Sequence, residues 1–161
     1  MKPTKQMVLS VGLPLALLVA LQLVPYGRDH TNPPARHVVA WNAEATRDLA
    51  MRACFDCHSN ETRWPWYASI APVSWRIQHN VREGREKLNF TALDPGSESA
   101  SDVADEAPEM VTKGKMPPLD YLLMHPEAWM SSTDRRALAT GLEATLAGFP
   151  EHARQGHDRN E

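Results

Sequence analysis

The residues Cys54-Phe55-Asp56-Cys57-His58 constrain what this chain can fold into more than any other feature. They form a Cys-x-x-Cys-His motif, which is typical of covalent attachment of a c-type haem. Two thiols three positions apart lie on one side of a helical turn, so both can reach the vinyl groups on one edge of a porphyrin. His58 follows at once and is placed to ligate the iron as its proximal ligand. We therefore predict one covalent haem c, bound through Cys54, Cys57 and His58.

Two other kinds of site use similar residues. A thioredoxin-like dithiol also contains Cys-x-x-Cys, but it occurs in a βαβ context that this chain lacks. A structural zinc site needs a second pair of ligands, and the available histidines, His79 and His125, do not have the usual spacing. A disulfide between Cys54 and Cys57, the only cysteines of the chain, would close too small a loop to stabilise the fold much. Haem attachment is the favoured interpretation.

The N-terminus carries an apolar run, residues 7–24, that follows Lys2 and Lys5. As a helix, these 18 residues would extend about 27 Å, close to the hydrocarbon thickness of a bilayer. No Ala-x-Ala site follows the run, so we predict that residues 1–26 form an uncleaved transmembrane helix, with a signal peptide as the alternative. The two lysines favour an inside N-terminus. The rest of the chain would then lie in the periplasm, anchored to a bacterial cytoplasmic membrane, on the side where c-type haem is attached.

The remainder of the chain is long enough for one compact domain. We expect a linker at residues 27–36, the haem domain at 37–150 and a disordered tail at 151–161. Strand signals are nearly absent, whereas several stretches have helical spacing. The predicted fold is therefore all-α: a small cytochrome c-like helical domain around one covalent haem, preceded by the transmembrane helix.

Four stretches of the domain are predicted helices. The first begins at the N-cap Asn42 and reaches Met51, and the second begins at Pro72 and ends at Gly84 or Leu88. The third covers residues 101–113, with a break or restart at Pro108. The fourth begins after the cap Ser131 or Ser132 and ends before Gly148. In the last of them, Leu138, Leu142, Thr145 and Leu146 form the expected buried stripe. Residues 94–97 are an expected turn.

The second axial ligand of the iron has three candidates. Met116 lies in Gly114-Lys115-Met116-Pro117-Pro118, where glycine allows a turn and the prolines would hold the thioether in place. The alternatives are His79, within a predicted helix, and His125, which precedes a proline; an open site is also possible. We favour Met116 as the distal ligand, since a lone histidine is a less specific signal and other methionines fill space.

Aromatic and charged residues complete the predicted site. The rings that follow the motif are Trp64, Trp66, Tyr67 and Trp75, which we expect to shield the iron from water. From Thr31 onward, 14 Lys and Arg residues stand against 19 Asp and Glu residues, a net charge of −5 that argues against nucleic acid as a partner. Six acidic residues and no basic one lie between Leu88 and Thr112. Such a run is usually a solvated face, but it could also attract a redox partner with a basic face.

Longer stretches around these residues are similar to a known family. Residues 54–67, 70–75 and 84–90, together with 26–34, 114–118, Tyr121, His125 and Asp134, resemble the small bacterial haem-binding domain proteins. The resemblance covers nearly the whole chain, apart from Ala107-Pro108, where the family more usually continues a helix. It implies a c-type cytochrome-like, membrane-anchored protein with covalent haem.

The predicted function is one-electron transfer between periplasmic or membrane redox partners. No catalytic base or substrate pocket is evident, so a carrier is favoured over an enzyme. The alternatives are a haem-based sensor or a small haem peroxidase, either of which needs an iron site that opens to a ligand, and an accessory protein in which haem only stabilises the fold.

Overall fold

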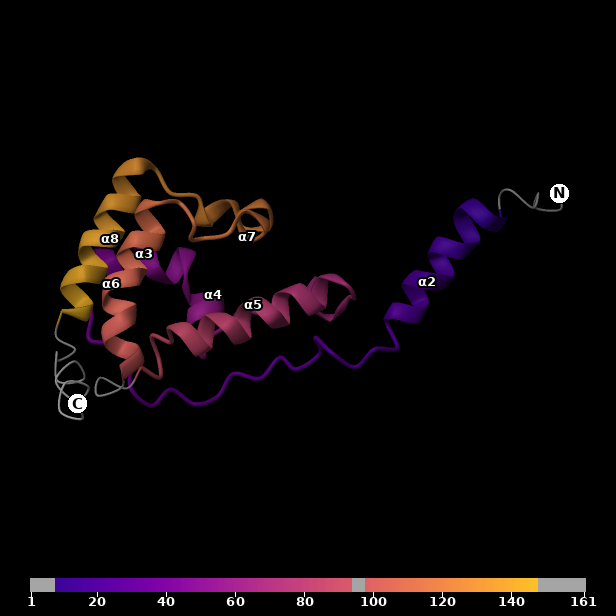
Figure 1. Cartoon of the computed structure of the whole chain (residues 1–161), viewed down its shortest axis with the longest axis horizontal. Coiled ribbons are helices and arrows are strands. Elements are labelled where there is room, and N and C mark those ends of the chain that lie inside the picture. The colour runs from indigo at the N-terminus through magenta and orange to yellow at the C-terminus, as the bar shows by residue number, and fades with distance from the viewer. Residues whose placement is uncertain (1–7, 94–97, 148–161) are drawn as a thin grey trace, which may run out of the picture. The chain divides into compact units, whose positions relative to one another are not determined.

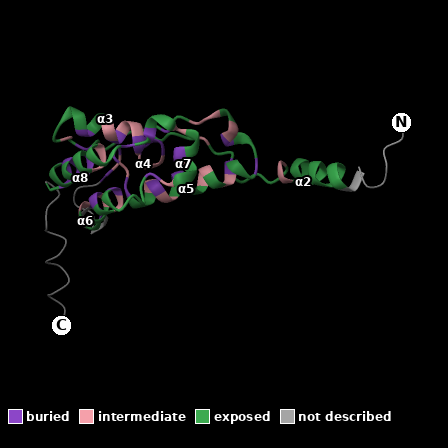
Figure 2. Ribbon diagram, turned by 90° about the horizontal axis from the view of Figure 1, so that it is seen from above, coloured by how far each residue is buried: buried purple, intermediate pink, exposed green. Residues whose placement is uncertain are grey.

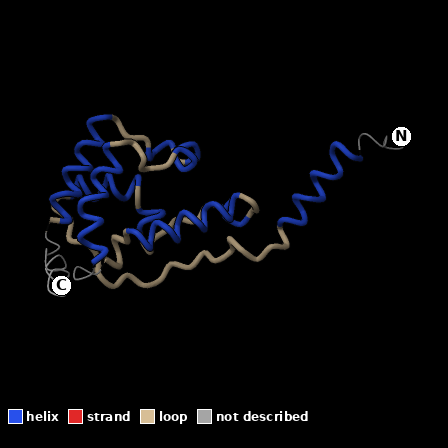
Figure 3. The backbone as a smooth tube through the Cα atoms, viewed as in Figure 1, coloured by secondary structure: helices blue, strands red, loops and turns tan. Residues whose placement is uncertain are grey.

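The computed structural model describes residues 8–93 and 98–147 of the chain. Within these ranges all regular elements are helices, with seven α-helices and no strand (Figure 3). The all-helical class agrees with the prediction for these residues. The chain divides into two compact units, Met1–Thr31 with Trp64–Asn80 and Asn32–Arg63 with Val81–Glu161. The predicted turn at 94–97 and tail at 151–161 lie outside the described residues.

The first unit begins with the apolar segment. A π-helical turn, Val8–Gly12, leads into α2 (Leu13–Leu21), none of whose residues is buried (Figure 2). No helix in the described part of the chain is both long and apolar enough to cross a membrane. The transmembrane helix predicted within residues 1–26 is therefore wrong, because the nine residues of α2 extend only about 14 Å. Beyond its end, the Gln22 amide exchanges two hydrogen bonds of 2.9 Å with the backbone of Ala71.

The remainder of the first unit surrounds the aromatic segment of the chain. The ring of His30 stacks on Trp64 with centroids 4.6 Å apart, and its Nε2 lies 3.1 Å from the carbonyl oxygen of Ala68. A short 3-10 helix, Trp66–Ser69, precedes α5 (Val73–Lys87). The helix begins where the sequence predicted and continues past Gly84. Its residues up to Asn80 belong to the first unit and the later ones to the second.

Three helices build the core of the second unit. They are α3 (Glu44–Ala53), α6 (Glu98–Thr112) and α8 (Ser132–Leu146), and α8 packs against both of the others (Figure 1). The predicted cap of α8 is confirmed at Ser131, whose hydroxyl accepts from the Asp134 amide at 3.0 Å while the Asp134 carboxylate accepts from the Ser131 amide at 3.1 Å. The predicted stripe is also confirmed, since Leu138, Leu142, Thr145 and Leu146 are all buried.

Two helix predictions fail, each because of a tertiary contact. Asn42 does not cap α3, whose N-cap is Ala43; its side chain accepts a hydrogen bond from the Thr145 hydroxyl at 2.9 Å instead. The helix does not break at Pro108, which lies buried inside an uninterrupted α6. Proline leaves one carbonyl of the preceding turn without its usual donor. Packing against α8, with Val103 and Val111 buried, keeps the helix continuous.

Aromatic rings pack together in the second unit and fix the short segments between its long helices. Phe55 stacks on Phe90 with centroids 5.6 Å apart, and Trp41 lies 5.0 Å from Phe90. Phe55 opens the short helix α4 (Phe55–His58), so this cluster fixes the position of α4 in the core. The short helices α7 (Leu119–Met124) and Pro126–Ala128 connect α6 to α8.

Candidate functional site

The Cys-x-x-Cys-His residues form one tight turn at the end of α3. Cys54 ends that helix, with its amide donating to Ala50 at 2.7 Å, and its own carbonyl accepts from the amides of Cys57 (3.1 Å) and His58 (2.9 Å). Cys54 and Cys57 are free thiols, and both are half-buried. The backbone therefore holds two unpaired thiols and the histidine within a single turn, as the spacing predicts.

The imidazole of His58 is held in one orientation by the backbone. Its Nδ1 lies 3.0 Å from the carbonyl oxygen of Leu88. A carbonyl oxygen can only accept, so Nδ1 carries the proton of this hydrogen bond. Burial lowers the pKa of His58 below its ordinary value, although hydrogen bonds to the backbone of Leu88 and Gly84 oppose that shift. The ring is therefore neutral near pH 7, with the lone pair of Nε2 available for a metal.

Hydrogen bonds from the segment after α5 fix the residues that follow the motif. The amide of Phe90 donates to the carbonyl of His58 at 2.8 Å, and the Asn60 amide donates to the Thr91 hydroxyl at 2.7 Å. α5 itself comes very close to the motif at Gly84, where an added Cβ would lie 2.5 Å from the carbonyl oxygen of Cys57. Only glycine allows this approach.

The chemistry of the two thiols argues against the alternative sites. Burial, and secondarily the neighbouring thiol, raises the pKa of Cys54 to about 12. Burial likewise raises the pKa of Cys57 to about 12, with smaller contributions from Asp56 and Asp120. A redox dithiol needs a lowered thiol pKa instead. Among the described residues, no group of three or more His, Cys, Asp or Glu side chains could hold a metal ion, so a zinc site finds no second pair of ligands.

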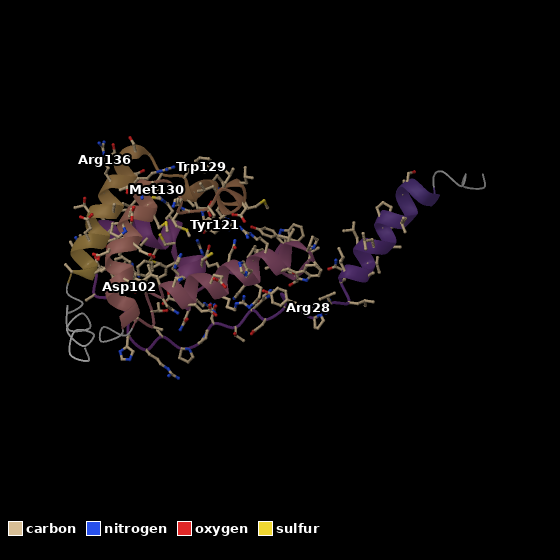
Figure 4. The ribbon with its side chains drawn as sticks, viewed as in Figure 1. Arg28, Asp102, Tyr121, Trp129, Met130 and Arg136 are labelled. Carbon is tan, nitrogen blue, oxygen red and sulfur yellow. The ribbon has the colours of Figure 1, made fainter. Side chains whose placement is uncertain are left out.

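A buried carboxylate lies between the two cysteines. Asp56 is 7% exposed, and its Oδ1 accepts from the Arg63 amide at 3.0 Å and from Nε of the same residue at 3.3 Å. Its Oδ2 accepts from the Tyr121 hydroxyl at 2.8 Å. Burial and this acid raise the pKa of Tyr121 far above its ordinary range, so the phenol keeps its proton. Figure 4 labels Tyr121, which extends from α7.

Met116 lies in a tight loop at the end of α6. The amides of Lys115 and Met116 both donate to the carbonyl of Met110, at 3.0 and 3.2 Å. Gly114 adopts φ +66°, a left-handed conformation that reverses the chain. The Met116 side chain is 37% exposed, whereas the following Pro117 is buried. The loop therefore anchors its backbone and leaves the thioether accessible, within the same compact unit as His58.

The other predicted ligands lie in different surroundings. His125 belongs to the unit of the motif, where its Nδ1 donates to the Tyr121 carbonyl at 3.0 Å and its ring stacks on the Tyr121 ring with centroids 4.0 Å apart. His79 is exposed on the part of α5 that belongs to the first unit. The predicted aromatic wall, Trp64, Trp66, Tyr67 and Trp75, also falls in the first unit.

A family model described as "Haem-binding domain" matches residues 16–144 of the chain. The match covers most of the sequence, including the motif and the Met116 loop. The chain belongs to the haem-binding domain family. No curated protein and no solved structure matches it. As a member of this family, the protein binds haem.

The residues of this haem-binding domain fit the group chemically. The two half-buried thiols and the oriented His58 lie in one turn, and the segment around Met116 presents large exposed apolar side chains, namely Met116, Leu119, Leu123, Met124 and Trp129. A porphyrin is a broad and mostly apolar plane, so it needs such side chains against its faces. The second unit therefore contains residues that would attach and ligate the group and apolar side chains that would cover it.

Three features of the haem-binding site are absent from the sequence predictions. They are the Leu88 carbonyl that orients His58, the close approach of Gly84 to Cys57, and the hydrogen bonds of Asp56 to Arg63 and Tyr121. Only Asp56 carried a signal, because an acid inside the motif must find partners once it is buried. The packing of Phe55, inside the motif, with Trp41 and Phe90 is a further feature that the sequence does not predict.

Proposed function

We propose that this haem-binding domain is a c-type cytochrome-like electron carrier. Cys54 and Cys57 would attach the haem, and His58 and Met116 would ligate its iron. The observation that carries this proposal is the hydrogen bond from His58 Nδ1 to the Leu88 carbonyl, within one turn of two unpaired thiols. That bond places the proton on Nδ1 and leaves Nε2 as the ring nitrogen for a metal, which is the arrangement of a proximal histidine.

Different residues of the chain would have different roles in such a carrier. When bound, haem supplies an iron that accepts and returns one electron. The Leu88 carbonyl fixes the ring of His58, and the exposed apolar side chains of α7 would keep water from the bound group. The thioether of Met116 is a soft ligand that favours the reduced metal, so it raises the reduction potential relative to a second histidine.

Covalent attachment is tested by replacing both thiols. Wild-type protein expressed with a c-type maturation system should keep its haem through denaturing electrophoresis. The double variant Cys54→Ala, Cys57→Ala should lose the haem stain completely. A stained band from the double variant would exclude c-type attachment.

The distal ligand is tested by optical spectra of the holoprotein. The ferric wild type should show the weak far-red charge-transfer band of an iron–methionine bond, and Met116→Ala should lose that band, bind carbon monoxide and have a lower potential. Met124→Ala is the control for loss of a thioether: Met124 belongs to the apolar cover but is not the proposed ligand, so this variant should keep the far-red band. A wild type that lacks the band, together with His125→Ala or His79→Ala opening the iron, would assign the ligand to a histidine. Ready carbon monoxide binding by the wild type would favour a sensor or peroxidase instead.

We also propose a basic redox partner and a location outside the cytoplasm. The acidic residues of α6 support the first, since Asp102 and Glu106 are exposed (Figure 4 labels Asp102). A negative face attracts a positively charged partner over distances near 10 Å. The second follows from the proposed covalent attachment, because c-type haem is joined to thiols outside the cytoplasmic membrane.

A further inference from the structure

The motif and α7 are linked by a hydrogen bond across 65 residues of sequence. The Tyr121 hydroxyl donates to Asp56 Oδ2 at 2.8 Å. Both residues belong to the second unit, and Asp56 is almost fully buried. A buried carboxylate needs partners, and removing one of them is costly. This contact is thus a strong constraint on where α7 can lie.

The motif end of this link is rigid. Asp56 lies in α4 between the two cysteines. Its Oδ1 accepts from the amide and Nε of Arg63, and its Oδ2 accepts from Nη2 of the same arginine at 3.4 Å as well as from Tyr121. Its own carbonyl accepts from the Thr62 hydroxyl at 2.7 Å. The carboxylate therefore cannot turn to follow a moving α7 without losing several hydrogen bonds.

The other end of the link is joined to Met116 by a short, stiff segment. Only four residues separate Met116 from Tyr121, and two of them are the prolines 117 and 118. Proline restricts the backbone to few conformations. The amides of Tyr121 and Leu122 both donate to the Pro118 carbonyl at 3.1 Å, so the segment moves as one piece. Where Tyr121 is held, the start of this segment is held too.

We propose that Asp56 and Tyr121 form a latch through which the haem-attachment motif positions the Met116 loop, so that Tyr121 is a positioning residue for the distal ligand. The inference rests on the proposed ligation by Met116. It assigns a function to the acid within the motif, which haem attachment itself does not require. The latch makes the two ends of the haem site, 58 residues apart in sequence from His58 to Met116, depend on each other.

The test removes one oxygen atom from the full-length holoprotein. Tyr121→Phe keeps the ring that stacks on His125 and loses only the hydroxyl that bonds Asp56. Tyr26→Phe is the matched control, since that tyrosine is in the first unit and 41% exposed. Hydrogen exchange of peptides covering residues 116–124 and the far-red ferric band are measured for both, together with carbon monoxide association.

A hydrogen bond to a charged group stabilises the closed position of α7, and its loss lets the segment open more often. We therefore expect about tenfold faster exchange of the α7 amides in Tyr121→Phe. We expect a weakened far-red band and about tenfold faster carbon monoxide association in the same variant, with haem still attached. Asp56→Asn keeps an acceptor for Tyr121 but loses its charge, so its effect should be smaller than that of Tyr121→Phe. The Tyr26→Phe control should match the wild type in every measurement.

The outcomes separate the latch from the proposed ligation. If exchange is unchanged in Tyr121→Phe, the latch is overturned. If exchange rises but the band and carbon monoxide association do not change, the contact stabilises α7 without positioning Met116, and the inference is again wrong. If the wild type lacks the band, ligation by Met116 fails, and with it the positioning role, while exchange alone still decides whether Tyr121 holds the segment.

Discussion

Replacement of Gly84 by alanine should test the contact between α5 and the haem motif. An added Cβ would lie 2.5 Å from the carbonyl oxygen of Cys57, 3.0 Å from its carbonyl carbon and 3.1 Å from its Cβ. Ordinary contact begins at 3.4 Å, so helix and motif would have to separate by about 0.9 Å. The atoms involved are mainly backbone, which cannot rotate away as the end of a side chain can.

Two opposing effects set the magnitude for Gly84→Ala. Alanine favours the helix over glycine by about 1 kcal/mol. Overpacking a close contact costs about 2–3 kcal/mol when the backbone must shift. The overpacking term is larger, so the free energy of unfolding should fall by about 1–2 kcal/mol. For a unit of this size the melting temperature should drop by roughly 5–10 °C.

The assay is thermal unfolding of the holoprotein, followed by circular dichroism at 222 nm. Lys87→Ala is the control, because it changes an exposed residue at the end of the same helix. Its melting temperature should lie within about 2 °C of the wild type, since exposed substitutions have small effects. A Gly84→Ala protein as stable as the wild type would refute the argument, since it would show that the contact is looser than the structure has it.

Three further predictions concern the thiols, the cap of α8 and the acidic face. In protein made without haem attachment, a thiol pKa of about 12 rather than 9.0 lowers the thiolate fraction at pH 8 about a thousandfold. Iodoacetamide should therefore label the native thiols far more slowly than the urea-unfolded ones, and the labelling rate should rise toward pH 12. Equal labelling rates for native and unfolded protein would contradict the burial of the thiols. Ser131→Ala should lower the free energy of unfolding in urea by about 1 kcal/mol through loss of the cap, whereas Ser132→Ala, inside the helix, should change it little. Reversing charge in Asp102→Lys, Glu106→Lys should slow electron transfer with a small basic redox protein in stopped-flow at low salt and not at high salt. Glu143→Lys, at an exposed position of α8, is its control, and an equal loss of rate there would argue against a specific acidic face.

Local signals in the sequence predicted several elements correctly. The cap at Ser131 and the apolar spacing from Leu138 to Leu146 locate α8, because hydrogen bonds and burial within one helix depend on neighbouring residues. The Cys54–His58 turn was likewise predicted from spacing alone. The apolar run at 7–24 was misjudged as a single long helix. Apolar character does not specify where a helix ends, and α2 ends at Leu21, after which Gln22 bonds Ala71.

The sequence by itself determined the haem motif, the helical class and the family, since each depends on residue types at fixed local spacing. The tertiary structure alone decided which groups orient and hold that motif. Leu88 contributes only its carbonyl to His58, and a backbone group has no signature in the sequence. Gly84 and Tyr121 act on the motif from 27 and 64 positions beyond Cys57. Contacts between residues so far apart depend on how whole helices pack, and packing is a property of the folded chain.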